Sequence, residues 1–360
     1  MYRKYRPQTF DEVVGQEHVV KTLQGALVSG RKGHAYLFCG PRGTGKTTVA
    51  RLFAKALNCE HITKDGDCDN SCPYCLAVNE NRSLDLVEID AASNRGIDEI
   101  RSLKESALVA APGGKHKIFI IDEVHMMTKD AFNALLKILE EPPSHVVFVL
   151  ATTEPHKILL TVLSRVQRFD FKRLTPSQIL GKLKQMSRAE KVNVAEEGLV
   201  AIAMSSDGAL RDAEVALSKV IAANDRNKTI TENDVYESLG LIPVSYYPEF
   251  LGYLAGNDKN SALDFINRVH AGGVDLEQFS SGFVGYLRKI LINSINPAVL
   301  VSVGEELLEN DKKVIAVYSQ ALTSDRLIRM LSAFISAKEG MRSSPLPQLP
   351  LELAILELIK

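Results

Sequence analysis

The chain has 360 residues, of which 45% are hydrophobic and 24% are charged, and its formal net charge is −1. That length allows two or three domains, each with its own core, in a globular protein of ordinary composition. The balanced charge excludes overall attraction to nucleic acid, so any such contact would need a local basic patch. No apolar run approaches a membrane span and none follows the basic N-terminus as in a secretory signal, so we expect a cytoplasmic protein.

The first part of the chain alternates apolar strand patterns with helical ones. Strands are predicted at 35–39, 84–89, 118–121 and 146–150. Helical periodicity lies between them, for example at 132–139, where Thr128 is a plausible N-cap and Pro142 a stop. This alternation predicts an α/β domain in which helices cover both faces of a parallel sheet.

A phosphate-binding P-loop, G-x-x-x-x-G-K-[ST], occupies residues 40–47 and matches at every fixed position. It follows a predicted strand and precedes a helical pattern, which is the context the motif requires. Its glycines let backbone N–H groups turn toward phosphate oxygens at a helix N-terminus. We expect Lys46 to reach the outer phosphates and the Thr47 hydroxyl to bind magnesium. The predicted nucleotide-binding residues here are Gly40, Pro41, Arg42, Gly43, Thr44, Gly45, Lys46, Thr47 and Thr48.

Two acids, Asp122 and Glu123, end the predicted strand at 118–121. In a P-loop enzyme the first acid belongs in the magnesium shell, and the second polarises the attacking water. Glu123 therefore favours an ATP hydrolase over a protein that only binds nucleotide. Thr152 and Thr153 follow the next strand. Either a threonine orients water near the γ-phosphate or the pair is a strand-end turn, and both interpretations stay open.

Four of the five cysteines cluster after the P-loop helix, and the last two form a C-x-x-C knuckle. They are Cys59, Cys68, Cys72 and Cys75. Four thiolates suit tetrahedral zinc, and four protein ligands leave no open position, so we predict a structural zinc site. Redox pairing and unligated thiols are the alternatives. Cys39 is predicted to be a buried core residue instead.

From about residue 174 onward the patterns are helical. Thr175 and Gln178 form a predicted capping box with Pro176 at the first helical position. A proline-bearing joint at 241–243 leads into a third region, which is again helical. We therefore expect three domains: 1–173 with the zinc module at about 58–79, a small helical domain at 174–241, and an all-α domain at 242–360.

Together these motifs resemble the AAA+ ATPases, and more narrowly the clamp-loader subunits of bacterial replicases, of the gamma/tau type of DNA polymerase III. The matching segments are 5–7, 15–16, 40–47, the four cysteines, 90–94, 122–125, 151–153, 164–165 and 210–212. The resemblance covers essentially the whole chain. The cysteine module is what separates this family from other AAA+ proteins. The family's Ser-Arg-Cys motif has Val166 in its last position here, which leaves the arginine unchanged.

The resemblance implies a role for several further residues. The segment Tyr5, Arg6 and Pro7 would hold adenine and ribose, and Thr153 would be the sensor 1 residue. Arg211 would be sensor 2 on a helical lid domain, and Arg165 would be an arginine finger acting on the ATP of a neighbouring subunit. The implied catalytic residues are Lys46, Asp122, Glu123, Thr153, Arg165 and Arg211.

The implied function is that of an ATP-hydrolysing motor subunit that loads a sliding clamp onto primed DNA, with ATP, Mg²⁺ and Zn²⁺ as cofactors. Its partners would be other clamp-loader subunits in an open ring closed by the helical collar at 242–360, together with the clamp and the DNA backbone. We do not expect it to polymerise DNA itself. Contacts with the helicase and polymerase core are not expected, because the extension that makes them in the family's longer form is absent from this sequence.

Arg95, Arg101 and Lys129 are predicted near helix N-termini, where they either follow DNA phosphates or are solvated surface charges.

Two other functions fit the P-loop. A branch-migration AAA+ helicase would have no use for the four cysteines, and a scaffold that binds ATP without hydrolysis would not need Glu123. A polymerase would need a second cluster of catalytic carboxylates, which the sequence does not suggest.

Overall fold

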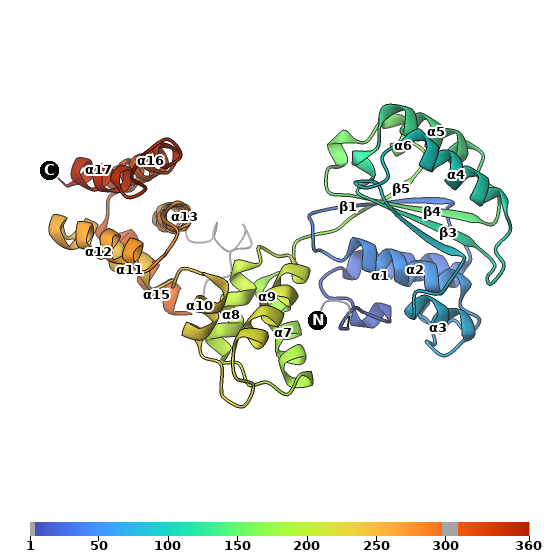
Figure 1. Cartoon of the computed structure of the whole chain (residues 1–360), viewed down its shortest axis with the longest axis horizontal. Helices are drawn as coiled ribbons and strands as arrows, with labels where there is room; N and C mark the ends of the chain where they lie inside the picture. The colour runs from blue at the N-terminus through green and yellow to red at the C-terminus, as the bar shows by residue number, and fades with distance from the viewer. Residues whose placement is uncertain (1–3, 297–308, 360) are drawn as a thin grey trace. The chain divides into compact units, whose positions relative to one another are not determined.

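The computed structural model describes residues 4–296 and 309–359 (Figure 1). The chain forms two compact units, Met1–Glu232 and Asn233–Lys360. The three predicted domain boundaries stay a prediction.

A parallel five-stranded sheet lies at the centre of the first unit, with the strand order β2-β3-β4-β1-β5. All four strand pairs are parallel, which confirms the predicted class of sheet. The strands are β1 Ala35–Cys39, β2 Leu86–Asp90, β3 Lys117–Asp122, β4 Val146–Thr152 and β5 Gln167–Asp170. Strand β5 was not predicted from the sequence; it is an edge strand whose only apolar residue is Phe169. Such a strand lacks the apolar pattern that predicts the others.

Helices cover both faces of this sheet, as predicted (Figure 1). One face packs on α1 Glu17–Ser29 and α2 Lys46–Asn58, and the other on α4 Ile97–Leu108, α5 Lys129–Glu140 and α6 Leu160–Leu163. Side chains of β1 alternate between them: Tyr36 and Phe38 belong to the α1–α2 core, whereas Leu37 and Cys39 belong to the α4–α5 core. Since both faces are buried, the central strands are apolar along most of their length, as at residues 118–121 of β3.

The remaining elements of the first unit are short helices and a helical bundle. They are η1 Phe10–Glu12, α3 Pro73–Asn79, η2 Val124–Met126, η3 Pro155–Lys157, α7 Pro176–Ala189, α8 Glu196–Ser205 and α9 Leu210–Ala223. The capping box of α7 at Thr175 and Gln178 is confirmed. The predicted cap of α5 is also confirmed, since the Thr128 hydroxyl accepts a hydrogen bond from Ala131 N at 3.3 Å. Helix α10, Glu232–Leu239, begins at the boundary between the two units.

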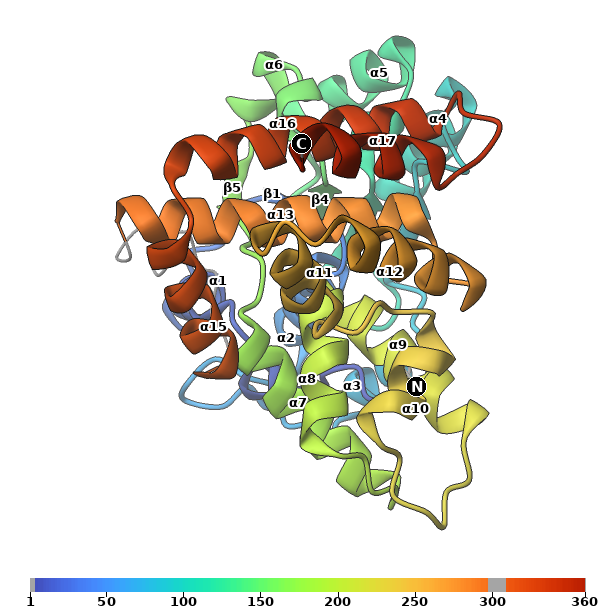
Figure 2. The same cartoon turned by 90° about the vertical axis from the view of Figure 1, so that its left-hand side faces the viewer.

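The described residues of the second unit are helical, which confirms the predicted all-α character of this part. Its helices after α10 are α11 Tyr246–Ala255, α12 Lys259–Ala271, α13 Leu276–Ile295, α15 Glu309–Ala321, α16 Ser324–Met341 and α17 Leu349–Leu358. Figure 2 shows α16 running along α13, and these two helices pack against each other. An aromatic core joins these helices to α11. The ring centroid of Phe283 on α13 lies 4.9 Å from the ring centroids of Phe250 on α11 and Phe334 on α16. Among residues 4–296 and 309–359, no helix is both long and apolar enough to cross a membrane.

Glu214 is a buried carboxyl group of the first unit whose pKa is strongly shifted. Glu214 on α9 is only 6% exposed. Burial raises the pKa of this carboxyl group to about 7, although the positive charges of Lys182, Arg6 and Arg211 oppose the shift. The folded protein therefore binds the Glu214 proton more tightly than the unfolded chain does, because burial disfavours the charged form.

The expected consequence is a pH-dependent loss of stability. The contribution of Glu214 is fully present below its unfolded pKa of about 4.5 and is lost as pH rises through about 7. Glu214→Gln removes the ionisation, so it should stabilise the full chain relative to wild type more at pH 8 than at pH 5, by up to about 3 kcal/mol. Urea unfolding at both pH values measures this. Glu197→Gln, at an exposed glutamate of α8, is the control. A Glu214→Gln effect of the same size at both pH values would contradict the account.

Candidate functional site

The P-loop joins the carboxyl end of β1 to α2, and two of its glycines are required by close approach. Gly40 has φ +149°, and a Cβ atom there would collide with the carbonyl oxygen of Phe171. Gly43 has φ +77°, and its Cβ would lie 2.8 Å from the Cβ of Ala209. The loop is thus packed between the end of β5 and the start of α9. Helix α2 begins at Lys46, directly after the loop, so its N-terminal N–H groups face the position of an anion.

Lys46 is held across this loop. Its Nζ donates hydrogen bonds to the carbonyl oxygens of Gly40 and Pro41, both at 2.8 Å. The side chain is buried, and burial lowers the pKa of the amine, whereas Glu123 and Asp122 act to raise it. The ammonium group therefore lies inside the loop, where phosphate oxygens would compete with the two carbonyls for its N–H donors.

The two predicted magnesium ligands meet at the carboxyl edge of the sheet. Thr47 Oγ1 donates to Asp122 Oδ2 at 2.7 Å, which joins the first turn of α2 to the end of β3. A hydroxyl and a carboxylate oxygen are the hard ligands that Mg²⁺ prefers. The structure thus brings the two residues together, and their role as magnesium ligands stays a prediction.

Glu123 follows Asp122 in a left-handed conformation with φ +48°. Its Oε2 accepts hydrogen bonds from Thr153 Oγ1 at 3.0 Å and from Thr153 N at 3.3 Å. Thr152 points elsewhere, with its hydroxyl 3.0 Å from His125 Nδ1. Of the two threonines, Thr153 is therefore the one that contacts Glu123. Non-glycine residues in such a backbone conformation concentrate at functional sites.

The sequence analysis assigned no role to two neighbours of Glu123. His125 Nδ1 lies 3.4 Å from Glu123 Oε2, and its Nε2 lies 3.3 Å from Glu154 Oε2. The pKa of the Glu154 carboxyl is lowered, mainly by its hydrogen bond with Lys157. His125 and Glu154 both follow the carboxyl ends of strands. Their position after predicted strands is the sequence feature that could have indicated a place in the site.

A cavity of about 420 Å³ unites most of the predicted nucleotide-binding residues. It is lined by Arg6, Pro7, Val13, Val14, Arg42, Gly43, Thr44, Gly45, Lys46, Thr47, Thr48, Asp90, Ala92, Asp122, Glu123, Leu174, Leu210, Arg211 and Glu214. Within the described residues, Tyr5 is outside this lining. Its hydroxyl donates to Glu190 Oε1 at 2.7 Å, so it ties the N-terminal segment to the end of α7.

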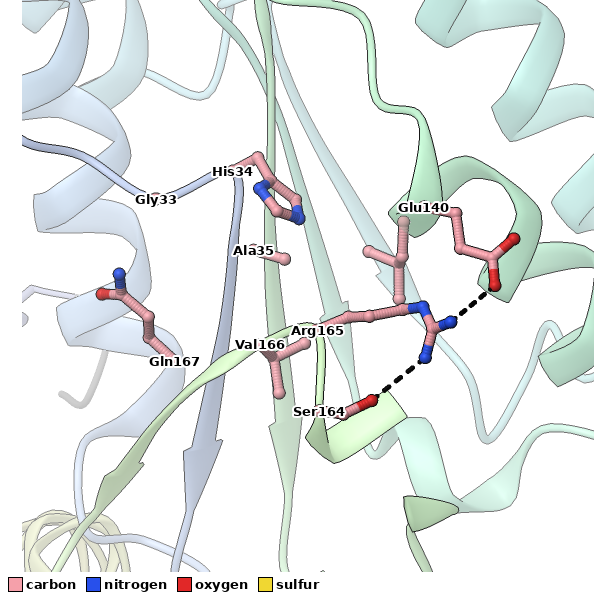
Figure 3. A pocket seen from close by; sticks show the side chains of 9 residues that line it. Gly33, His34, Ala35, Glu140, Ser164, Arg165, Val166 and Gln167 are labelled. Atoms are coloured by element: carbon pink, nitrogen blue, oxygen red, sulfur yellow. Dashed lines mark hydrogen bonds and ion pairs between the residues drawn. The ribbon is translucent and has the colours of Figure 1, made fainter. Parts of the chain in front are cut away.

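Arg165 lies at the opposite edge of the sheet (Figure 3). It lines a second cavity of about 550 Å³ together with Gly33–Ala35, which lead into β1, and Gln167, which begins β5. The P-loop leaves the other end of β1, and five residues of strand separate the two edges by roughly 13 Å. The structure therefore does not bring Arg165 to the P-loop of its own chain.

The cysteine module gathers donor atoms in a pattern that differs in one residue from the prediction. Cys59, Cys72 and Cys75 offer sulfur atoms that, with an Asp69 carboxylate oxygen, all lie within 4.8 Å of one another. Among the residues described, Cys68 is not in this group, although its thiol is hydrogen-bonded to that of Cys75. Asp69 also accepts hydrogen bonds from Ser71 and from Cys72 N, and this contact with Ser71 is the main cause of its lowered pKa.

The three thiols fit three corners of a tetrahedral zinc site, and Asp69 and Cys68 are the two candidates for the fourth. Burial raises the pKa of the Cys59 thiol to about 12, and the hydrogen bond with Cys68 raises that of Cys75. Without a cation the Cys59 and Cys75 thiols therefore stay protonated, and a bound metal would supply the positive charge that stabilises thiolates. Cys39 is a separate, buried residue of β1, as predicted, and burial raises its pKa to about 11.

The three predicted DNA contacts are exposed on α4 and α5 or next to them. The carbonyl oxygen of Arg95 accepts a hydrogen bond from Thr128 N at 3.1 Å, which places Arg95 beside Lys129, the first residue of α5. Arg101 instead forms an ion pair with Asp98 at 3.0 Å. Arg95 and Lys129 therefore lie near each other, whereas Arg101 has an anionic partner.

Comparisons with known proteins agree with these features. Residues 15–175 match the family model described as "DNA polymerase III, delta subunit", and residues 230–360 match "DNA polymerase III subunits gamma and tau domain III". The solved structure of the Thermotoga maritima RuvB Holliday junction branch migration motor is a remote likeness, with a TM-score of 0.48 and 19% identity over 69% of this chain and 79% of that one.

Curated relatives match almost the whole sequence. The chain is 39% identical to DNA polymerase III subunit tau of Bacillus subtilis over 99% of its own length and 62% of that protein's. It is 40% identical to the Escherichia coli subunit tau over 83% of this chain and 46% of that protein. It is 37% identical to the Mycobacterium tuberculosis subunit gamma/tau, over 100% of this chain and 62% of that protein. The chain therefore spans less than two thirds of the length of these relatives. Over most of its own length the chain is similar to the gamma/tau subunits of bacterial DNA polymerase III.

Proposed function

We propose that this chain is an AAA+ ATP hydrolase and the motor subunit of a bacterial clamp loader. It would use ATP binding and hydrolysis to open a sliding clamp and load it onto primed DNA. The observation that carries this proposal is the cavity in which the P-loop, Asp122, Glu123 and Arg211 meet. The named relatives support the replication role.

Several residues in or beside the cavity have a role in this proposal. Lys46 neutralises the outer phosphates, and Thr47 and Asp122 hold the magnesium ion that offsets their charge. Glu123 polarises the attacking water, and Thr153 orients Glu123 through the 3.0 Å hydrogen bond. Arg211, Arg6 and Pro7 close the cavity from the α9 side and from the N-terminal segment. Tyr5 contributes by fixing that segment to α7.

Hydrolysis in this proposal needs a second subunit. Arg165 lies at the amino edge of the sheet, away from its own P-loop, so it would act on the ATP of a neighbouring subunit. An arginine supplied in this way contributes roughly 10³–10⁵ in rate. ATP would then lie at a subunit interface of an open ring, with residues 174–241 as the lid and 242–360 as the collar that holds the ring together.

We further propose a cytoplasmic protein with a structural zinc site and contacts to the DNA backbone. Zinc would be held by Cys59, Cys72 and Cys75, with Cys68 as the fourth ligand and Asp69 orienting the knuckle. Arg95 and Lys129 would bind phosphates, and Arg101 less so because Asp98 neutralises it. Removing Arg95 or Lys129 should reduce the salt dependence of DNA binding by the assembly, and an unchanged dependence would exclude these contacts.

The first test of the proposal is Glu123→Gln. The substitution keeps the shape of the side chain but removes the charge that polarises water. ATP turnover by the assembled complex should fall by roughly 10²–10⁴, while the affinity for ATP changes little. Steady-state turnover and equilibrium binding of a fluorescent ATP analogue measure the two effects. Lys46→Ala, which should lose binding itself, is the matched contrast. Turnover of Glu123→Gln at the wild-type rate would contradict the hydrolytic role.

The second test concerns the metal. Purified chain should contain one equivalent of zinc, measured by elemental mass spectrometry, and Cys59→Ser, Cys72→Ser or Cys75→Ser should lose it. Cys68→Ser should also lose it, whereas Asp69→Asn should retain it, which identifies the fourth ligand. Cys39→Ser is the control, since it changes a buried cysteine outside the module. Full zinc content in all four module variants would rule out the site.

A further inference from the structure

We propose that Glu140 restrains Arg165, holding the guanidinium on its own chain and slowing ATP cleavage at the neighbouring site until a phosphate displaces the carboxylate. This inference rests on the proposed function, in which Arg165 acts on the ATP of another subunit. It assigns a role to a residue at the end of α5 that the sequence analysis did not single out.

Among the described residues, Arg165 donates hydrogen bonds to three partners, and Figure 3 draws two of them, Ser164 and Glu140. One terminal nitrogen donates to the Thr161 carbonyl oxygen at 2.7 Å and to Ser164 Oγ at 3.0 Å. The other donates to Glu140 Oε1 at 2.7 Å, which makes an ion pair. Of these three contacts, only the one with Glu140 joins opposite charges.

A phosphate and the Glu140 carboxylate would compete for the same cation. Guanidinium N–H donors bind either anion in similar geometry, so one N–H group cannot serve both. The negative charge of Glu140 beside Arg165 also offsets the positive potential that an approaching triphosphate would meet. The charge on Glu140 therefore opposes the interaction for which Arg165 is placed. The neutral partners Thr161 and Ser164 orient the arginine without this opposition.

The restraint is weak enough to be released. The Glu140 side chain is 51% exposed and that of Arg165 is 33% exposed. Exposed ion pairs of this kind are readily exchanged. Arg165 and Glu140 both line the cavity of about 550 Å³, which gives the arginine side chain room to move. A neighbouring subunit that brings a triphosphate to this edge could therefore displace the carboxylate.

The test compares single-turnover ATP cleavage in the assembled complex. Glu140→Gln keeps an oxygen acceptor for Arg165 and removes only the charge, so cleavage should become up to about fivefold faster, the equivalent of about 1 kcal/mol. Glu141→Gln removes the same charge from the adjacent exposed residue and should leave the rate unchanged. Combined with Arg165→Ala, the Glu140→Gln change should have no effect. A gain in rate also cannot result from misfolding.

The outcomes separate this inference from the proposed function. If Arg165→Ala slows cleavage but Glu140→Gln is no faster than Glu141→Gln, Glu140 does not restrain the arginine. A slower Glu140→Gln complex would equally overturn the inference, because it would make the carboxylate an aid to Arg165. If Arg165→Ala cleaves ATP at the wild-type rate, the proposed action of Arg165 on a neighbouring site fails, and the inference fails with it.

Discussion

The parallel direction of all five strands is the constraint on which the rest of the site depends. Because β1, β3 and β4 end at the same edge, the segments that follow them must meet there. These are the P-loop, the pair Asp122 and Glu123, and the pair Thr152 and Thr153. Because Arg165 precedes β5, it lies at the amino ends of the strands, at the opposite edge of the sheet. One chain therefore carries the nucleotide cavity at one edge of the sheet and the arginine at the other.

A cation at each edge is held by oxygen atoms of its own chain. Lys46 donates its hydrogen bonds to the neutral carbonyl oxygens of Gly40 and Pro41, not to a carboxylate. Arg165 is half-buried and shares its charge with Glu140. This difference in partner would let the cavity bind ATP readily, while cleavage waits for a neighbouring subunit.

Most of the site could be predicted because its residues lie in short sequence motifs. The parts that could not be predicted depend on contacts between residues far apart in the sequence. The P-loop, the acids after β3 and the cap at Thr128 are encoded in short segments, so spacing alone located them. Strand β5 was missed because an edge strand with one apolar residue has no pattern of its own. Glu140 meets Arg165 across 25 residues of chain, and no periodicity connects them. The approach of Asp69 to three cysteines likewise depends on how the loop folds.

If each nucleotide site is completed by a second subunit, two inactive variants should restore each other's activity when they are mixed. One variant, Arg165→Ala, keeps an intact nucleotide cavity, and the other, Glu123→Gln, keeps the arginine. In co-assembled complexes the account predicts ATP turnover well above that of either variant alone, because one chain supplies the arginine to the cavity of the other. A mixture no more active than its separate components would contradict the account.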